Sequence, residues 1–507
     1  MGEEAHEHFK SENALLLYSD ATFKPPLSPP MFINISFHSQ SHTSQDHNPS
    51  AFESHPSSST SPINVLQHQH PKDAWLPLTE SRNGNAYSAA FHILSSNIGF
   101  QALMLPVAFA TLGWAWGAIC LSLAFVWQLY TIFLLVQLHE SVPGTRHSRY
   151  LFLAITAFGS RLGKLAALFP VMYLSGGTCV MFIITGGRTL KLLFNTLCDN
   201  DCDAHSLTGV EWFLVFTCVA ILIAQLPNLH SLTAVSLVGA VTAITYCTLF
   251  WFLSVKKGRP HGVSYTSSLS HGSAVDKISD VLNAIGIIVL AFRGHNVLLE
   301  IQGTLPSNIV ETSKGPMRRG VSISYILIAM CVFPLAIAGF WAYGNQIPDG
   351  GLLTAFPQFH REQVTKFSMG AMYLLIIIHC LSSFQVYAMP VFDNLELRYT
   401  SMKDKKCPRW VRTCLRLFFG GFTFFMAVTF PFLPSLSALL GGFTLVPVTY
   451  AYPCFMWLSI KKPRVKGVVW WFNLALGCLG MFLSVLLVAA AIKALADKGL
   501  HANFYKP

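Results

Sequence analysis

The chain contains few charged residues. Lys, Arg, Asp and Glu make up 11% of its 507 positions, whereas hydrophobic residues make up 52%. A typical soluble domain carries about 25% charged residues, so this composition instead predicts a polytopic membrane protein. The net charge of +10 does not indicate a nucleic-acid partner, because the basic residues lie in loops between apolar segments. We expect a lipid bilayer, and no nucleic acid, around this protein.

The sequence also lacks the motifs of common cofactor and metal sites. Its twelve cysteines are scattered without a CxxC pair, which argues against a zinc or redox centre. No phosphate-binding loop occurs, so we expect that ATP does not drive the activity directly, and no catalytic set of residues is evident. No signal peptide is recognisable, and the first apolar segment is expected to act as its own insertion signal. We therefore expect neither an enzyme nor a bound cofactor.

Apolar segments long enough to cross a bilayer recur eleven times along the chain. Basic residues are concentrated in every second loop, which predicts a cytosolic N-terminus. Because eleven is an odd number, the C-terminus is then extracellular. The segments cover residues 86–112, 115–138, 165–197, 210–226, 229–255, 278–305, 317–345, 364–393, 411–431, 434–459 and 468–494.

Residues 1–80 form a region of different composition. The stretch 38–62 consists almost wholly of Ser, His, Gln, Asn, Thr and Pro, and it cannot bury enough apolar surface to offset chain entropy. We expect a disordered cytosolic tail. A metal site in its histidines is the weaker interpretation, because their spacing is irregular.

Two cysteines, Cys198 and Cys202, lie in a loop that this topology places outside the cell. Their spacing allows a small disulfide, and disulfides persist in an oxidising environment. Two reduced thiols are the alternative.

Two of the apolar segments are interrupted in the middle by polar residues. Segment 86–112 contains Ser95-Ser96-Asn97-Ile98-Gly99-Phe100-Gln101, and segment 278–305 contains Phe292-Arg293-Gly294-His295-Asn296. Polar groups at this depth are costly unless they line a cavity. Paired interrupted helices in two halves of a chain indicate the binding site of a secondary transporter.

The segments group as five, five and one, with an interrupted segment first in each group of five. This arrangement predicts two inverted repeats, residues 81–255 and 278–460, followed by an extra helix at 468–494. An odd number of crossings in the first repeat turns the second copy over in the membrane.

Several motifs resemble the plant lysine/histidine-type transporters of the amino acid/auxin permease family. They are Gly294-His295-Asn296-Val297-Leu298-Leu299-Glu300-Ile301-Gln302, Ser313-Lys314-Gly315-Pro316-Met317, Gln385-Val386-Tyr387-Ala388-Met389-Pro390-Val391-Phe392-Asp393, Leu105-Pro106, Leu112-Gly113-Trp114 and Thr185-Gly186-Gly187. The resemblance implies an all-α membrane protein with eleven helices in a LeuT-like 5+5 inverted repeat, broken in helices 1 and 6. It also implies proton symport of amino acids into the cell at the plasma membrane. The chain departs from the family pattern at Gln101, where relatives carry glycine, and at Arg293, where they carry a small residue.

The two interruptions supply the candidate substrate-binding residues. Unpaired N–H groups at a helix start attract a carboxylate, and unpaired carbonyl groups at a helix end suit an ammonium group. For Gly99 alone, close helix packing is the alternative role. The candidates are Asn97, Gly99, Phe100, Gln101, Arg293, Gly294, His295 and Asn296.

Arg293 is the most unusual residue of the sequence, because an arginine near the bilayer centre costs several kcal/mol unless it is paired or hydrated. Three roles remain open. The first is bidentate binding of the substrate carboxylate, the second is an ion pair with Glu300 or Asp280 in a gate or in the framework, and the third is contact with a water-filled vestibule.

Proton coupling has three candidates. His295 either carries a proton or caps helix carbonyls, and His379 either carries a proton or fills a packing position in an apolar segment. Glu300 lies about two turns beyond the second interruption, which favours a place in an inside gate.

The sequence supports transport of amino acids, and two other functions remain open. One is a carrier of auxin-like or other carboxylates. The second is a sensor on the same fold that binds amino acids without transporting them and signals through the histidine-rich tail. The sequence does not separate neutral, basic and acidic substrates, and it does not define the oligomeric state.

Overall fold

The computed structural model describes residues 75–142, 145–198, 207–226, 230–267, 273–308, 311–361, 363–465 and 467–498. Within these ranges the chain is helical and contains no β-strand, so the predicted all-α class is confirmed. The described residues belong to one compact unit, residues 65–507. Almost all of the predicted tail and Cys202 lie outside the described residues, so the disordered tail and the Cys198–Cys202 disulfide stay predictions.

Eight helical stretches in the described part of the chain are long and apolar enough to cross a membrane. They are Phe100–Leu138, Ser160–Leu197, His230–Lys257, Lys314–Gln346, Lys366–Lys403, Arg409–Thr429, Leu436–Lys461 and Val468–Asp497. A shorter apolar helix covers Gly209–Ile223. Neither interrupted segment is found whole among the eight, because each is divided into shorter pieces; of the first one, only residues 100–112 belong to one of these stretches, Phe100–Leu138. The multi-pass architecture is thus established, and the count of eleven crossings stays a prediction.

Apart from the short turn η5 (His230–Leu232), the described part of the first repeat, as predicted from the sequence, holds nine helical elements. They are α2 (Ala86–Asn97), η2 (Phe100–Met104), α3 (Leu105–Leu138), α4 (Tyr150–Phe158), α5 (Ser160–Met172), the π-helical turn η3 (Tyr173–Gly177), α6 (Thr178–Leu197), α7 (Gly209–Ile223) and α8 (Thr233–Lys257).

The remaining elements, apart from the short turn η6 (Gly344–Gln346), follow in chain order. They are α9 (Ala274–Ala291), α10 (His295–Gly303), α11 (Lys314–Tyr343), α12 (Leu352–His360), α13 (Lys366–Lys403), α14 (Arg409–Thr429), α15 (Leu433–Val446), the π-helical turn η7 (Pro447–Ala451), α16 (Tyr452–Lys461) and α17 (Val468–Lys498).

The helix boundaries follow local signals in the sequence. Gly113 has a φ of +74° inside α3, which separates the predicted segments 86–112 and 115–138 without a loop. Asn85 begins α2 as an N-cap, because its side chain accepts a hydrogen bond from the Ser88 backbone N–H. The helices α4 and α12 lie between the predicted segments and are too short to cross a bilayer.

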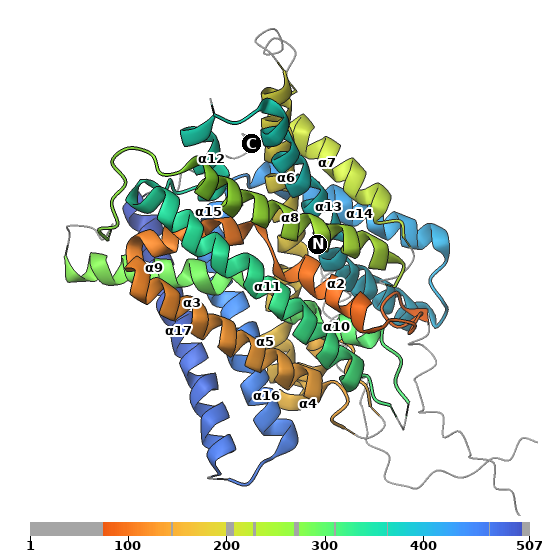
Figure 1. The fold of residues 1–507 in the computed structure, drawn as a ribbon. Coiled ribbons are helices and arrows are strands. Elements are labelled where there is room, and N and C mark those ends of the chain that lie inside the picture. Colours follow the sequence, from red (N-terminus) through yellow and green to blue (C-terminus); the bar gives the residue numbers. More distant parts are fainter. Residues whose placement is uncertain are drawn as a thin grey trace, which may run out of the picture. The chain divides into compact units, whose positions relative to one another are not determined.

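The interrupted helices lie within the bundle. Helix α2 packs against α8, α11 and α13, and α10 packs against α2 and α3; Figure 1 shows α2 running beside α11. Gly239 of α8 permits one close approach, since a Cβ there would collide with Ser382 of α13. Large apolar side chains point outward elsewhere, such as Leu165, which is 80% exposed, and this surface suits contact with lipid.

Candidate substrate site

The first interruption is a real break in the helix. Helix α2 ends at Asn97, the backbone is extended at Ile98 and Gly99, and a short turn, η2, leads into α3. A Cβ on Gly99 would lie 2.6 Å from Oε1 of Gln101, so glycine allows the Gln101 side chain to fold over the break. The predicted break in the first segment is therefore confirmed.

The second interruption separates α9 from α10. Phe292 is extended, and Gly294 has a φ of +95°, a conformation that favours glycine. A Cβ on Gly294 would lie 2.5 Å from Nδ2 of Asn97, so the two breaks touch each other at this point. The structure thus brings together the two polar stretches that the sequence places about 200 residues apart.

Gln128 of α3 links the two breaks. Its Nε2 donates hydrogen bonds to Oδ1 of Asn97, at 3.2 Å, and to the backbone carbonyl of Arg293, at 3.1 Å. Tyr325 of α11 donates to the same Asn97 oxygen at 3.4 Å. Sequence reasoning missed Gln128, although a glutamine in the middle of an apolar segment is itself a signal of a buried polar contact.

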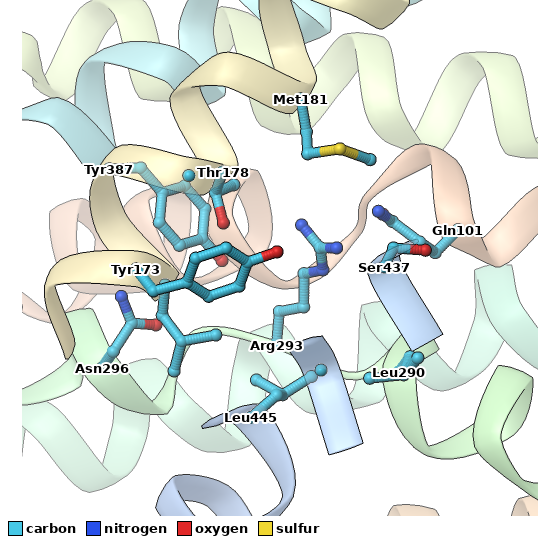
Figure 2. A pocket seen from close by; sticks show the side chains of 13 residues that line it. Gln101, Tyr173, Thr178, Met181, Leu290, Arg293, Asn296, Tyr387, Ser437 and Leu445 are labelled. Atoms are coloured by element: carbon cyan, nitrogen blue, oxygen red, sulfur yellow. The ribbon is translucent and has the colours of Figure 1, made fainter. Parts of the chain in front are cut away.

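A small cavity lies beside the breaks (Figure 2), with about 40 Å³ of water-accessible space. A buried water needs about 10–15 Å³ on this measure, so the cavity admits a few waters, and an amino acid requires its walls to move apart. Elements η3, α6, α13 and α15 complete the walls. The lining residues are Gln101, Tyr173, Leu174, Gly177, Thr178, Met181, Leu290, Arg293, Asn296, Tyr387, Ser437, Gly441 and Leu445.

The Arg293 side chain extends into this cavity. Figure 2 shows its guanidinium group between Gln101 on one side and Tyr173 on the other, with Met181 beyond it. None of the ion pairs among the described residues joins Arg293 to Glu300 or Asp280. The predicted ion-pair role is therefore absent from this conformation, and the roles in substrate binding and in a hydrated vestibule remain.

Gln101 is the second polar group available to a ligand. Its side chain is 9% exposed, and neither Oε1 nor Nε2 has a hydrogen-bond partner. Two other lining residues are already bonded, because Asn296 Nδ2 donates to Ser175 Oγ at 3.2 Å and the Tyr387 hydroxyl donates to the Ser96 carbonyl at 2.8 Å. An unpartnered buried amide is costly unless a ligand or water satisfies it.

Three predicted substrate-binding residues, Gln101, Arg293 and Asn296, line the cavity. The other five, Asn97, Gly99, Phe100, Gly294 and His295, build or flank the breaks and are not among its lining residues. His295 is buried, and its Nε2 lies 2.9 Å from Oγ1 of Thr131 on α3.

His379 lies apart from the cavity, where α2, α8 and α13 meet. Its Nδ1 is 3.0 Å from the Gly239 carbonyl, and its Nε2 is 3.3 Å from Oγ of Ser383. Ser383 in turn donates to the Ser95 carbonyl at 2.6 Å. The two nitrogens are thus hydrogen-bonded, which suits both a packing role and a place in a proton relay.

Glu300 also lies apart from the cavity, in a group of buried charges. Its Oε1 accepts a hydrogen bond from the Tyr150 backbone N–H at 3.3 Å. Nearby, Arg149 pairs with Asp393, with Nε to Oδ2 at 2.5 Å and Nη2 to Oδ1 at 3.3 Å. We call Arg149, Asp393 and Glu300 the paired cluster. It joins α4, α10 and α13, and it also contacts the segment that precedes α2, because the Leu78 N–H donates to Asp393 Oδ1 at 3.3 Å.

Sequence reasoning missed the wall of the cavity that faces Arg293. Tyr173 and Thr178 come from the π-helical turn and the start of α6, and Ser437 comes from α15. The stretch Ser175-Gly176-Gly177-Thr178 was the available signal, because small and polar residues interrupt an otherwise apolar segment there. Which helix faces the breaks is set by packing between distant parts of the chain, and no local pattern reports it.

Two interrupted helices meeting beside a cavity in a helical membrane bundle define the fold of a secondary transporter. One solved structure that the chain resembles is MhsT in complex with L-phenylalanine, with a TM-score of 0.51 and 11% identity, covering 81% of this chain and 99% of that one. This likeness concerns the fold.

Residues 82–494 match the family described as "Transmembrane amino acid transporter protein", and the chain belongs to that family. Two relatives from Arabidopsis thaliana are "Lysine histidine transporter-like 8", 53% identical over 88% of this chain and 85% of the relative, and "Lysine histidine transporter-like 7", 48% identical over 86% and 90%. The predicted resemblance is confirmed, and the protein is an amino acid transporter rather than an enzyme.

Proposed function

We propose that this protein imports amino acids across the plasma membrane, by alternating access around the two breaks. The observation that supports this most strongly is the cavity beside them, where Arg293 and the unpartnered amide of Gln101 meet. Because the cavity is too small for an amino acid, the described conformation corresponds to a closed state of the cycle.

The substrate carboxylate binds between Arg293 and Gln101. A guanidinium group offers two parallel N–H donors to a carboxylate, and Gln101 Nε2 adds a third donor from the opposite wall. Hydroxyl groups of Thr178 and Ser437 are suitable acceptors for the substrate ammonium group. Leu290, Leu445 and Met181, which also line the cavity, offer apolar contacts to the substrate side chain.

Proton symport requires a group that changes its charge during the cycle. His295, His379 and Glu300 are the buried candidates, and each lies on or against an interrupted helix. We place the paired cluster on the cytosolic side, because Arg149 belongs to a loop rich in basic residues that the predicted topology puts there. In this position the cluster closes the path from the cavity to the cytosol.

Transport by the purified full chain in proteoliposomes tests this function. Labelled amino acid should accumulate when the outside is made acidic, and accumulation should vanish when a protonophore removes the gradient. Exchange of labelled for unlabelled amino acid without a gradient gives a second readout of flux. Saturable binding with no flux in either assay would contradict transport and favour the sensor.

A carboxylate carrier is the second candidate, and Arg293 is the observation that favours it. A substrate without an ammonium group, such as an indole acetate, would still satisfy the guanidinium group. The two functions are separated by adding this acid or a neutral amino acid as an unlabelled competitor of labelled amino acid uptake. The amino acid should compete and the acid should not.

A further inference from the structure

We propose that the cavity selects its substrates by charge, accepting zwitterionic and acidic amino acids and rejecting cationic ones. This proposal rests on the proposed transport function and specifies its substrate class. Among the described residues that line the cavity, Arg293 is the one charged side chain, and no carboxylate lines it. The names of the two relatives mention lysine, which is a cationic amino acid. We therefore expect the substrates of this chain to differ from what those names state.

The charge of Arg293 is permanent. A guanidinium group does not lose its proton under physiological conditions, so the cavity keeps one positive charge throughout the transport cycle. Repulsion between like charges is also stronger in a poorly solvated cavity than in water. The Arg293 side chain extends into this cavity, so a substrate that binds there lies beside its guanidinium group.

The neighbouring acidic groups do not offset this charge. Glu300 accepts a hydrogen bond from the Tyr150 backbone, Asp393 is bound to Arg149, and neither lines the cavity. A zwitterion brings one carboxylate for Arg293 and one ammonium group for the neutral oxygens. Lysine brings a second ammonium group, for which the lining residues offer no opposite charge.

Matched pairs of substrates isolate charge from size. Norleucine has the carbon chain of lysine without its side-chain ammonium group, and glutamine matches glutamate in shape. In proteoliposomes at one fixed pH and with no membrane potential, we expect the ratio of Vmax to KM for norleucine to exceed that for lysine at least tenfold, or about 1.4 kcal/mol. Glutamate should be carried at least as well as glutamine.

Variants at the cavity test the origin of the selectivity. Arg293→Gln should reduce the norleucine-to-lysine ratio at least tenfold, whereas Arg293→Lys should keep the ratio while weakening both substrates. Arg188→Gln is the matched control, because Arg188 lies on α6 outside the cavity and donates to the Pro431 carbonyl at 2.9 Å. This control should leave the ratio unchanged.

The outcomes are distinguishable from a failure of the transport function. Equal transport of lysine and norleucine by the natural protein would overturn charge selection while leaving transport intact. Absence of all amino acid flux would overturn the transport function. In that case, thermal stabilisation of the purified protein by norleucine but not by lysine still supports charge selection, and equal stabilisation overturns it. If Arg293→Gln fails to fold, the comparison of lysine with norleucine transport by the natural protein still decides whether the cavity selects by charge.

Discussion

Two regions inside the helical bundle hold an arginine, and the surroundings of the two side chains differ. In the paired cluster, Arg149 contacts Asp393 through two hydrogen bonds. In the cavity, Arg293 faces neutral side chains, and no described acidic group pairs with it. A buried charge is tolerable when an opposite charge and hydrogen bonds offset its desolvation. The first arginine is thus satisfied by the protein itself, whereas we propose that the second is satisfied by the substrate that enters the cavity.

The largest effect should come from breaking the paired cluster. Asp393→Asn removes the carboxylate that Arg149 contacts through two hydrogen bonds, and breaking a buried pair costs about 3–5 kcal/mol. We expect a strong loss of folded protein, measured by size-exclusion chromatography and thermal unfolding. The double variant Arg149→Met with Asp393→Leu should recover part of the loss. No recovery would show that the cluster matters for more than its charge balance.

The next effect concerns Arg293 and should fall on affinity rather than on folding. Arg293→Ala removes a charge-assisted hydrogen bond worth about 1.5–3 kcal/mol, so KM should rise by roughly 10- to 150-fold. Abundance and thermal stability should stay near those of the natural protein, because no described ion pair is broken. An unchanged KM in a well-folded variant would leave the hydrated vestibule as its role.

Substitution of Gln128 should have a smaller effect, which falls on both folding and transport. Gln128→Leu removes two hydrogen bonds that connect the breaks, each worth about 0.5–1.5 kcal/mol. We expect Vmax to fall several-fold and the melting temperature to drop, since the breaks lose their common anchor. Thr131→Val on the same helix is the comparison variant. It removes the contact between Thr131 and His295 and keeps the Gln128 side chain with its two hydrogen bonds. A larger loss of Vmax in Thr131→Val would shift attention to His295.

The smallest effect should follow removal of residues 1–70. This segment is rich in polar residues and has no apolar periodicity with which to dock on the bundle. Substrate affinity should change less than about twofold in uptake assays corrected for surface abundance. A tenfold loss of affinity would show that the tail contributes to the substrate site.

The sequence predicted the backbone of the site better than its walls. Glycine and polar residues in the middle of apolar segments identified both breaks, because such residues are costly in a continuous membrane helix. The position of Arg293 in the middle of an apolar segment made it a candidate site residue for the same reason, and the structure places it in the lining of the cavity. A pairing of Arg293 with Glu300, one of the three roles that the sequence left open, is not seen in this conformation; a spacing of two turns does not reveal that Glu300 accepts a hydrogen bond from the Tyr150 backbone. The wall from η3 and α15 depends on tertiary packing, which no local pattern encodes.

Calorimetry with a substrate analogue that lacks the carboxylate shows whether Arg293 binds the substrate carboxylate. The affinities of norleucine and of norleucine amide, which lacks the carboxylate, are measured by calorimetry for the natural protein and for Arg293→Ala. We expect the amide to bind the natural protein at least tenfold more weakly than norleucine, and this difference should largely disappear in Arg293→Ala. An equal penalty for the amide in both proteins would contradict the account.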